Sequence, residues 1–478
     1  MSRLVLGIDV GTTSVKVVLV QPDGQTILAN QSKDTQANVP SDLGVEGNKQ
    51  DVPKILSAIH SCVSRLPKDL LKQVESIGIC GQMHGVTLWK SDAVAATTSS
   101  GGGGATNNGH QNQFKLDIDK DGVSHLYTWQ DGRCDIGFLD SLPRSSSHLA
   151  LHTGYGCATL FWFAKNKPEK LKKYDRCGTV QDLVVSLLCG SAEGPVRMSN
   201  QNAASWGYFC TEACDWDREA LARGDFPERL LPQEVLGPGE SAGRLCRSWF
   251  GIPKGVNIGV ALGDLQCSVY ALLKQPSDAV LNISTSAQLA YVHPTLKPDA
   301  INESKKIEYF PYFDDKYLAV AASLNGGNTL ATFVKSLQQW ILDLGFSVPQ
   351  SKVWEKLIKL AADEATSRSD MQIVPTLLGE RYAPQQTASV SGISLDTLDL
   401  GSIFRALCSG IIKNLHDMMP RDELAAFGIE RIVGNGSGLV RNPVLQQEVS
   451  HWYRLPLELG HSGDAALGAA LALLQTNG

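Results

Sequence analysis

The sequence predicts an α/β protein built from two similar halves that face one ligand across a cleft. Three observations indicate this fold. The chain has 478 residues, which is too many for a single hydrophobic core. Apolar segments with strand periodicity alternate with segments of helical periodicity. A strand, a hydroxyl-rich turn and a second strand begin the chain, and the same arrangement recurs at residues 279–292.

The composition of the chain is typical of a globular protein and argues against several classes. Hydrophobic residues make up 43% of the chain, and the net charge is −6 without a long basic block, so we expect neither nucleic acid nor membrane as a partner. The 11 cysteines show no Cys-x-x-Cys pair, so we expect reduced thiols and a cytoplasmic location. We expect no signal sequence, because Asp9 interrupts the first apolar run.

The first element is a predicted hairpin, GIDVGTTSVK at residues 7–16. Apolar residues alternate on both sides of its turn. Gly11 leaves the backbone open to close approach, and the N–H groups and hydroxyls of the turn suit an anion, while Asp9 could hold a cation that the anion shares. An ordinary turn, in which Ser and Thr bond their own backbone, explains this stretch equally well.

A helix and a strand follow the hairpin. Asp51 and Pro53 mark the start of the helix, as a cap and a first-turn proline. Residues 74–80 form the strand, which ends in GQMHG at residues 81–85. Binding residues favour such strand ends in α/β proteins, so we expect them here.

The middle of the chain contains less regular segments. Residues 91–113 are rich in Ser, Gly, Ala and Asn and predict a flexible surface insertion. An aromatic-rich helix is expected at 156–169 and a loop at 200–209. Gly and Pro then cluster before a new apolar strand, which places a domain boundary at about residue 256 and divides the chain into 1–256 and 257–478.

The second half keeps the α/β order. A glycine pair opens a helix within residues 323–334, and a strand enters a glycine-rich loop within 430–438. Asn442 is expected to cap the next helix, and Asp464 the closing helix at 463–474. The chain lacks both the dinucleotide-binding and the P-loop glycine signatures, so any nucleotide would be bound by another architecture.

Asp264, in VALGDLQCS at residues 260–268, is the sharpest candidate for chemistry. An aspartate after an apolar strand can take a proton from a sugar hydroxyl, and Gln266 could orient that sugar. A helix cap is the more common role for an aspartate in this position.

Three further side chains could be functional. His84 could contact sugar oxygens or be a structural hydrogen-bonding group, and Trp129 could stack on a sugar or belong to the core. For Asp131 and Arg133 we favour a structural ion pair over catalysis. No His/Asp/Glu cluster has metal-ligand spacing, so we expect any metal to arrive with phosphate, as Mg²⁺ does.

Taken together, these segments resemble the FGGY family of carbohydrate kinases over essentially the whole chain. The matching segments occur in the family's order: GIDVGTTSVK, GQMHGV, WQDGR, NQNAASWGYF, GDLQCSVY, NISTS, SLNGGN and LLGER. The resemblance implies two ribonuclease-H-like domains of the actin/hexokinase type flanking a catalytic cleft. It also implies an ATP- and Mg²⁺-dependent kinase for the terminal primary hydroxyl of a ketose, with sedoheptulose, which feeds the pentose phosphate pathway, as the expected substrate.

The resemblance assigns a role to each candidate residue. It makes Asp264 the base, and it makes Asp9 the residue that reaches Mg²⁺, through water. The side chains expected to bind the sugar are Gln82, His84, Trp129 and Gln266. The residues expected to bind the nucleotide are Thr12, Thr13, Lys16, Thr285, Ser286, Gly326, Gly327, Gly436 and Asn442. The first domain would therefore hold the sugar and one phosphate turn, and the second domain would hold the other turn and adenosine.

Three alternatives to this function stay open at the level of sequence. One is a pentulose kinase that resembles xylulose kinases. Composition cannot distinguish five-carbon from seven-carbon sugars, because the shape of the site selects the length of the sugar. Another is an ATPase or scaffold of the same fold without a sugar pocket. A third is a regulatory protein that binds sugar but has no catalytic activity. In the favoured interpretation the partners are a ketose and ATP, and the protein is a monomer or a homodimer.

Overall fold

The computed structural model describes residues 3–44, 47–99, 116, 118–191, 194–295, 306–363, 370–460 and 464–475. These residues form two units that interleave along the chain. The first unit consists of Met1–Ala271, Phe310–Asp315 and Asp464–Gly478, and the second of Leu272–Tyr309 and Lys316–Gly463. The sequence predicts one boundary at about residue 256, whereas the first unit continues past it and also takes in two later segments. The assignment of functions to the two halves stays a prediction.

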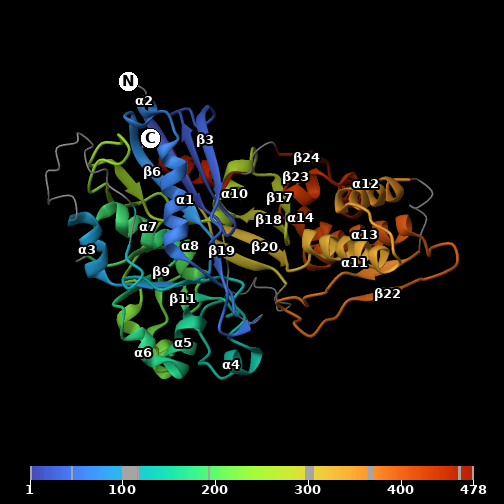
Figure 1. Ribbon diagram of the computed structural model, residues 1–478, viewed down its shortest axis with the longest axis horizontal. Coiled ribbons are helices and arrows are strands. Elements are labelled where there is room, and N and C mark those ends of the chain that lie inside the picture. The colour runs from blue at the N-terminus through green and yellow to red at the C-terminus, as the bar shows by residue number, and fades with distance from the viewer. Residues whose placement is uncertain are drawn as a thin grey trace. The chain divides into compact units, whose positions relative to one another are not determined.

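A mixed seven-stranded sheet is the centre of the first unit (Figure 1). Its order is β14-β15-β6-β1-β2-β3, and β16 also pairs with β6. β1 runs antiparallel to β2 and parallel to β6, which confirms the predicted hairpin. The strands are β1 (Leu4–Val10), β2 (Ser14–Val20), β3 (Ile27–Asp34), β6 (Val74–Gly81), β14 (Ser241–Arg244), β15 (Asn257–Gly259) and β16 (Leu262–Gly263).

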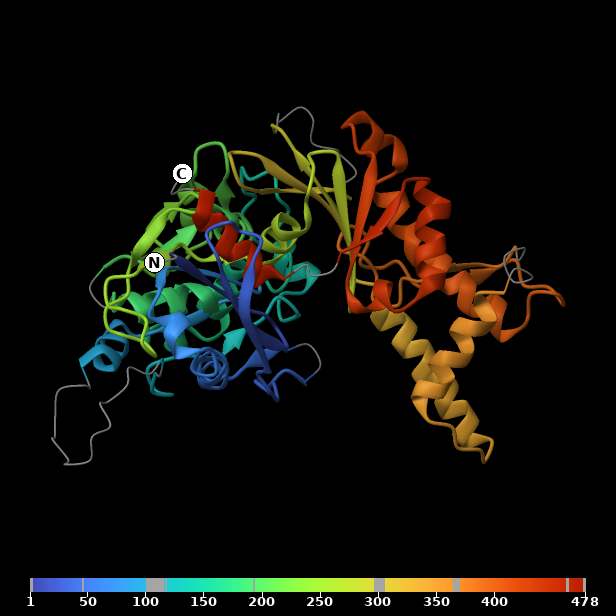
Figure 2. The same ribbon diagram turned by 90° about the horizontal axis from the view of Figure 1, so that it is seen from above.

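Helix α17 (Ala465–Gln475) packs on β1 and β6, and Figure 2 shows it in red across the blue strands. The contact is very close. A Cβ on Gly7 would lie 1.9 Å from the carbonyl oxygen of Ala466, and one on Gly78 would lie 2.1 Å from that of Ala469. Glycine is therefore required at both positions of the sheet. The small side chains of α17 complete this contact, and Asp464 caps the helix through Ala466 N, as predicted.

The other elements of the first unit surround this sheet. Helix α1 (Val52–Ser64) begins with Asp51 as its cap and Pro53 in its first turn, as the sequence predicts. The remaining helices are α2 (Lys68–Leu71), α3 (Ser91–Ser99), α4 (Ile136–Asp140), α5 (Gly156–Asn166), α6 (Pro168–Leu171), α7 (Val180–Cys189), α8 (Asn200–Ala204), α9 (Arg218–Arg223), the 3₁₀ helix η2 (Glu228–Leu230) and α10 (Asp264–Leu272). The short strands are β4 (Asn38–Val39), β5 (Lys49–Gln50), β7 (Thr87–Trp89), β8 (Leu126–Tyr127), β9 (Arg176–Gly178), β10 (Arg197–Ser199), β11 (Phe209–Cys210), β12 (Asp215–Trp216) and β13 (Glu234–Leu236).

A mixed six-stranded sheet is the centre of the second unit, in the order β19-β20-β18-β17-β23-β24. Its strands are β17 (Asp278–Ile283), β18 (Ala287–His293), β19 (Glu308–Pro311), β20 (Tyr317–Ser323), β23 (Arg431–Asn435) and β24 (Leu457–Leu459). The helices are α11 (Gly327–Asp343), α12 (Gln350–Ala361), α13 (Leu400–Met418), α14 (Arg421–Ala426), α15 (Ser437–Val440) and α16 (Pro443–Tyr453), and β21 (Gln372–Val374) pairs with β22 (Ser389–Ser391). The core lies where α13 meets the sheet, with Phe404, Ile411 and Leu415 fully buried.

The predicted flexible insertion at 91–113 is wrong in its first part. Residues 91–99 form α3, and residues 100–113 lie outside the described residues. Asp175 accepts hydrogen bonds from both the backbone N and the hydroxyl of Ser91, and Val94 is fully buried, so tertiary contacts override a weak helix-forming composition. The predicted loop at 200–209 likewise begins with α8, which Ser199 caps.

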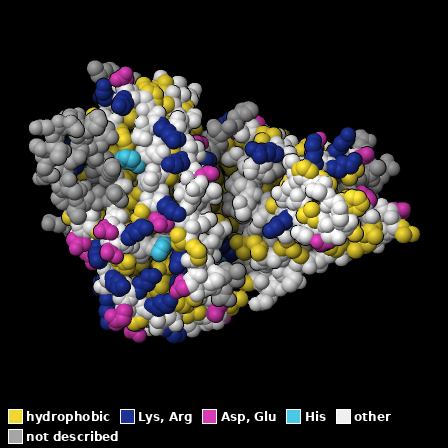
Figure 3. Space-filling view, viewed as in Figure 1, with side chains coloured by type: hydrophobic (Ala, Val, Ile, Leu, Met, Phe, Trp, Pro, Cys, Tyr) yellow, Lys and Arg dark blue, Asp and Glu magenta, His cyan; other side chains and the backbone are white. Residues whose placement is uncertain are grey.

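The surface of the second unit exposes several apolar side chains. Figure 3 shows hydrophobic atoms gathered over the β22 region, where Val390, Ile393 and Leu395 are exposed. Among the described residues, no helix combines the length and the apolar character needed to cross a membrane.

Candidate functional site

The first hydroxyl turn joins β1 to β2 and is held from several sides. Gly11 N donates to the carbonyl of Ser14, over 3.1 Å. The Thr12 carbonyl accepts from Gln50 Nε2 over 2.8 Å, and the Thr12 hydroxyl oxygen accepts from Trp129 Nε1 over 3.0 Å. The Thr13 carbonyl accepts from the backbone N of Thr35, and the Thr13 side chain is exposed. The turn therefore has a fixed backbone and keeps an exposed hydroxyl, as a phosphate turn requires.

Two carboxylates dominate the electrostatics beside this turn. Asp9, near the end of β1, is 8% exposed, and burial raises its pKa to about 8, with further increases from the charges of Asp264 and Asp464 and an opposing effect of Lys16. Asp264 begins α10, and burial raises its pKa to about 7, although the backbone N of Leu265 donates to its Oδ1. The charges of two other carboxylates and of one lysine thus act on Asp9, and this excess of negative charge suits a cation held through water.

Asp264 is held at the end of a parallel strand pair. β16 runs beside β6 with Gly263 opposite Gly81, and Gly263 N donates to Gln201 Oε1 over 3.2 Å. A Cβ on Gly263 would lie 2.4 Å from Gln266 Oε1, so a larger residue here would displace the Gln266 side chain. Gln266 itself is fully buried, and its Nε2 donates to the Pro311 carbonyl. The structure thus places the buried Gln266 side chain against Gly263, the residue before Asp264.

The predicted sugar residues Gln82, His84 and Trp129 all lie in the first unit. Gln82 is 1% exposed, its Nε2 donates to Gln50 Oε1 over 3.0 Å, and its own Oε1 is buried without a hydrogen-bond partner. His84 adopts a positive φ of 71°, and its Nδ1 donates to the Ser205 carbonyl over 2.8 Å. Its ring stacks on Tyr155 with centroids 4.4 Å apart. The imidazole is therefore held in one orientation by both contacts.

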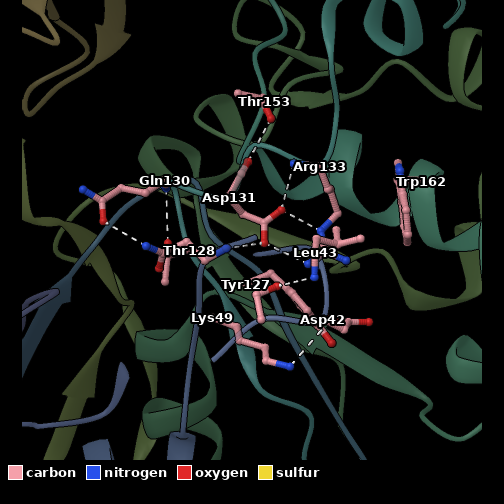
Figure 4. Close-up of polar contacts among 12 residues, drawn as sticks. Asp42, Leu43, Lys49, Tyr127, Thr128, Gln130, Asp131, Arg133, Thr153 and Trp162 are labelled. Carbon is pink, nitrogen blue, oxygen red and sulfur yellow. Dashed lines mark hydrogen bonds and ion pairs between the residues drawn. The ribbon is translucent and has the colours of Figure 1, made fainter. Parts of the chain in front are cut away.

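The WQDGR segment contains a buried ion pair, which confirms the structural interpretation of Asp131 and Arg133. Arg133 Nε and Nη2 donate to the two Asp131 carboxylate oxygens over 2.6 and 2.8 Å. The guanidinium lies 4.5 Å from the centre of the Tyr127 ring. Figure 4 shows the Asp131 carboxylate facing Arg133, and the hydroxyl of Thr153, from a separate segment of the chain, donating to the Asp131 carbonyl. Both charges are satisfied, so the pair fixes the turn that carries Trp129.

The second hydroxyl turn, between β17 and β18, contacts the start of α11 within the second unit. Asn328 N donates to the Thr285 carbonyl and Gly327 N to the Ser284 carbonyl, each over 3.0 Å. A Cβ on Gly326 would lie 2.5 Å from the Ser286 carbonyl carbon, and one on Gly327 would lie 2.0 Å from the Ser284 oxygen. Four predicted nucleotide residues therefore meet: Thr285, Ser286, Gly326 and Gly327.

The remaining predicted nucleotide residues have different surroundings. Gly436 has a φ of 91°, and a Cβ there would lie 2.3 Å from the Ile283 carbonyl oxygen, so the loop after β23 requires glycine. Asn442 is 3% exposed, and its Oδ1 accepts from Val444 N and Leu445 N as the cap of α16. The Asn442 side chain is thus bound within the fold, and only neighbouring backbone is left for a nucleotide.

Sequence reasoning missed two residues that contact these segments. Gln50 contacts the first turn, as described above. Glu380, in LLGER, is fully buried and accepts hydrogen bonds from Ser323 Oγ over 2.6 Å and from Asn325 Nδ2 over 2.9 Å, next to the glycine pair. The available signal was weak, because the donors lie 57 and 55 residues away from Glu380. Within the described part of the chain, no group of three or more His, Cys, Asp or Glu is arranged to hold a metal ion.

Comparison with known proteins places the chain among sugar kinases. Residues 4–96 match the N-terminal domain of the FGGY family of carbohydrate kinases. The chain is 47% identical to sedoheptulokinase from Mus musculus, over 98% of this chain and 97% of that protein. It is 48% identical to sedoheptulokinase from Homo sapiens, over 99% and 97%. The crystal structure of xylulose kinase from Rhodospirillum rubrum matches with a TM-score of 0.76 and 18% identity, over 100% of this chain and 91% of that chain.

Proposed function

The chain belongs to the FGGY family of carbohydrate kinases, and we propose that it transfers the γ-phosphate of ATP to the terminal primary hydroxyl of sedoheptulose. The product is sedoheptulose 7-phosphate. The observation that carries this proposal is the identity of almost half the residues to two sedoheptulokinases over nearly the full length of each chain. The mixed α/β fold, with its two main sheets, is the fold of carbohydrate kinases.

In this proposal Asp264 is the general base. Its raised pKa, about 7, supports the role, because a base works best when its pKa lies near the working pH. The backbone N of Leu265 donates to Oδ1 of Asp264, and the residue is partly exposed. Asp264 accepts the hydroxyl proton as the oxygen attacks phosphorus, which contributes roughly 10²–10⁴ in rate.

The two hydroxyl turns are proposed to bind phosphate groups, each within its own unit. Thr12, Thr13 and Lys16 offer hydroxyls and a positive charge in the first unit. In the second unit, Thr285 and Ser286 lie against the glycine pair Gly326 and Gly327, which leaves the backbone open to a phosphate. Backbone near Gly436 and Asn442 is proposed to flank adenosine. Hydrogen bonds to developing charge on the phosphate oxygens stabilise the transition state.

Asp9 is proposed to bind Mg²⁺ through water, and the residues present fit such an ion. The Asp9 carboxyl is raised in pKa by burial and by two neighbouring carboxylates, so a cation would relieve an unfavourable concentration of negative charge. When bound with ATP, Mg²⁺ would offset charge on the phosphate oxygens. The sugar is proposed to contact Gln82, His84, Trp129 and Gln266.

An assay that identifies the product tests this function. The protein is incubated with Mg²⁺-ATP and, in parallel, sedoheptulose, xylulose or no sugar, and the phosphosugar is identified by mass spectrometry. We expect the largest kcat/KM with sedoheptulose and little ATP hydrolysis without sugar. A larger kcat/KM with xylulose would show a pentulose kinase. Equal ATP turnover without sugar, and no phosphosugar, would show an ATPase.

A further inference from the structure

Gln50 connects a predicted sugar-binding side chain to the first phosphate turn. It lies in β5 and is 1% exposed. Its Nε2 donates to the Thr12 carbonyl over 2.8 Å and to Asn38 Oδ1 over 2.9 Å, and its Oε1 accepts from Gln82 Nε2 over 3.0 Å. Both ends of the Gln50 amide are therefore engaged, and the amide is held in one orientation. A buried amide bound in this way transmits a displacement of one partner to the other.

The backbone around Gln50 is fixed by strand pairing and by a hydrogen bond. Gln50 pairs with Leu126 of β8, and the neighbouring Asn48 N donates to Asp131 Oδ2 over 3.0 Å. Asp131 is the acid of the buried ion pair in Figure 4, which also fixes the turn of Trp129. Gln50 contacts the carbonyl of Thr12, and Trp129 contacts its hydroxyl. The backbone segments that carry Gln50 and Trp129 are both tied to Asp131.

The other end of this series of hydrogen bonds is an acceptor without a partner. Gln82 Oε1 is buried and accepts no hydrogen bond from any described group. An unpaired buried acceptor is costly, so a hydroxyl donor that reached Gln82 Oε1 on ligand binding would stabilise it. A ketose carries several hydroxyl donors, and one of them would complete the series from sugar through Gln82 and Gln50 to the Thr12 carbonyl.

We propose that Gln50 is a positioning residue for phosphoryl transfer, because its amide links the orientation of Gln82 to the position of the Thr12 carbonyl. This inference rests on the proposed sugar kinase function and adds a residue to it. Gln50 reaches neither reactant, so its effect appears as a loss of alignment. Alignment of two bound reactants contributes more to such a reaction than any single polar contact.

A double-mutant cycle tests the link. Gln50→Leu, Gln82→Leu and the double variant are compared with the wild type for kcat and for KM of ATP and sedoheptulose. We expect Gln50→Leu to lower kcat about 10-fold or more. The double variant should be no slower than the slower single variant, because both changes break one series of hydrogen bonds. If the two losses multiply, the proposal is wrong.

Ser124→Ala is the matched control for the loss of buried hydrogen bonds. Ser124 is 5% exposed, accepts from Leu88 N and donates to the His125 carbonyl, with no contact to the phosphate turn. We expect this control to keep its kcat even where its thermal unfolding midpoint falls as far as that of Gln50→Leu. Equal losses of kcat in both variants would make the effect of Gln50 a general loss of stability and would overturn the proposal.

The wild-type measurement separates this proposal from the function on which it rests. If the wild type forms no sedoheptulose phosphate, the proposed substrate is wrong. If the wild type forms it and Gln50→Leu keeps kcat within about twofold, then only the role of Gln50 is wrong. Circular dichroism of each variant confirms that the fold is retained before the rates are compared.

Discussion

At the scale of single residues, burial of carboxylates sets the chemistry of the first unit. Asp9 lies near the end of β1 and Asp264 directly follows β16, and both strands pair with β6; burial is the largest cause of the raised pKa of each carboxyl. The same burial has opposite consequences for the two. In the proposed mechanism it gives Asp264 the basicity that proton transfer requires, and a cation bound near Asp9 would favour the charged form of that carboxyl.

Asp264→Asn tests the proposed base. The amide keeps the shape of the side chain but cannot accept a proton, so kcat should fall by about 10²-fold or more. KM for ATP and for sedoheptulose should change little, because the amide side chain would still occupy the same volume. Steady-state kinetics with both substrates measure this. Turnover within a few-fold of the wild type would remove Asp264 from the role of base.

Asp9→Asn should stabilise the empty protein and impair the enzyme. The pKa of Asp9 is about 8 in the folded state, against an ordinary value of 3.8. The folded state therefore binds the proton more tightly than the unfolded state, and stability falls as pH rises from about 4 through about 8. The asparagine removes this loss, so at alkaline pH the free energy of unfolding should rise by about 1 kcal/mol or more.

Urea unfolding at acid and alkaline pH measures this difference, and the exposed Asp69→Asn is the control. The gain should be present at alkaline pH and vanish at acid pH, where both states of the wild type are protonated. A gain that is equal at both pH values would contradict the electrostatic explanation.

At the scale of elements, the sequence predicts what is local and misses what is distant. Both hydroxyl hairpins and the caps at Asp51, Asn442 and Asp464 are confirmed, because alternation and capping act over a few residues. Gln50 reaches Thr12 across 38 residues, and no periodicity in the sequence marks such a contact. Helix α3 was missed for the same reason, since the residue that holds its start, Asp175, lies 84 residues beyond Ser91.

Gly327→Ala tests whether the second turn and α11 form one phosphate-binding element. The added Cβ would lie 2.0 Å from the Ser284 carbonyl oxygen, which is backbone and cannot rotate away. The turn and the helix must separate, so KM for ATP should rise about 10-fold while KM for sedoheptulose stays constant. The cost in stability should be about 1–3 kcal/mol.

Gly194→Ala is a suitable control for the Gly327 variant, because a Cβ at Gly194 meets nothing within 4 Å. It should leave both KM values unchanged. A Gly327→Ala protein with normal KM for ATP would show that this junction does not bind nucleotide.

At the scale of the whole molecule, the chain returns to its first unit after completing the second. Helix α17 covers β1 and β6 and buries Ala466, Ala469 and Ala470 there. Asp464, which precedes this helix, also adds to the charge around Asp9. The end of the chain is therefore part of the first unit's core.

Deletion of residues 464–478 should prevent folding of the first unit. The deletion would expose the apolar surface of β1 and β6 to water and remove the helix that fills the space above Gly7 and Gly78. Expression yield and circular dichroism measure the result, and we expect insoluble or unfolded protein. A soluble, cooperatively unfolding product would show that α17 is dispensable for the fold.

The most direct test of the central claim is a crystal structure with sedoheptulose and a non-hydrolysable ATP analogue bound together. We expect the terminal primary hydroxyl of the sugar within hydrogen-bond distance, about 2.6–3.2 Å, of an Asp264 carboxylate oxygen, and in line with the γ-phosphate. A complex in which the Asp264 carboxylate points away from that hydroxyl, while another residue contacts it, would contradict the proposed mechanism.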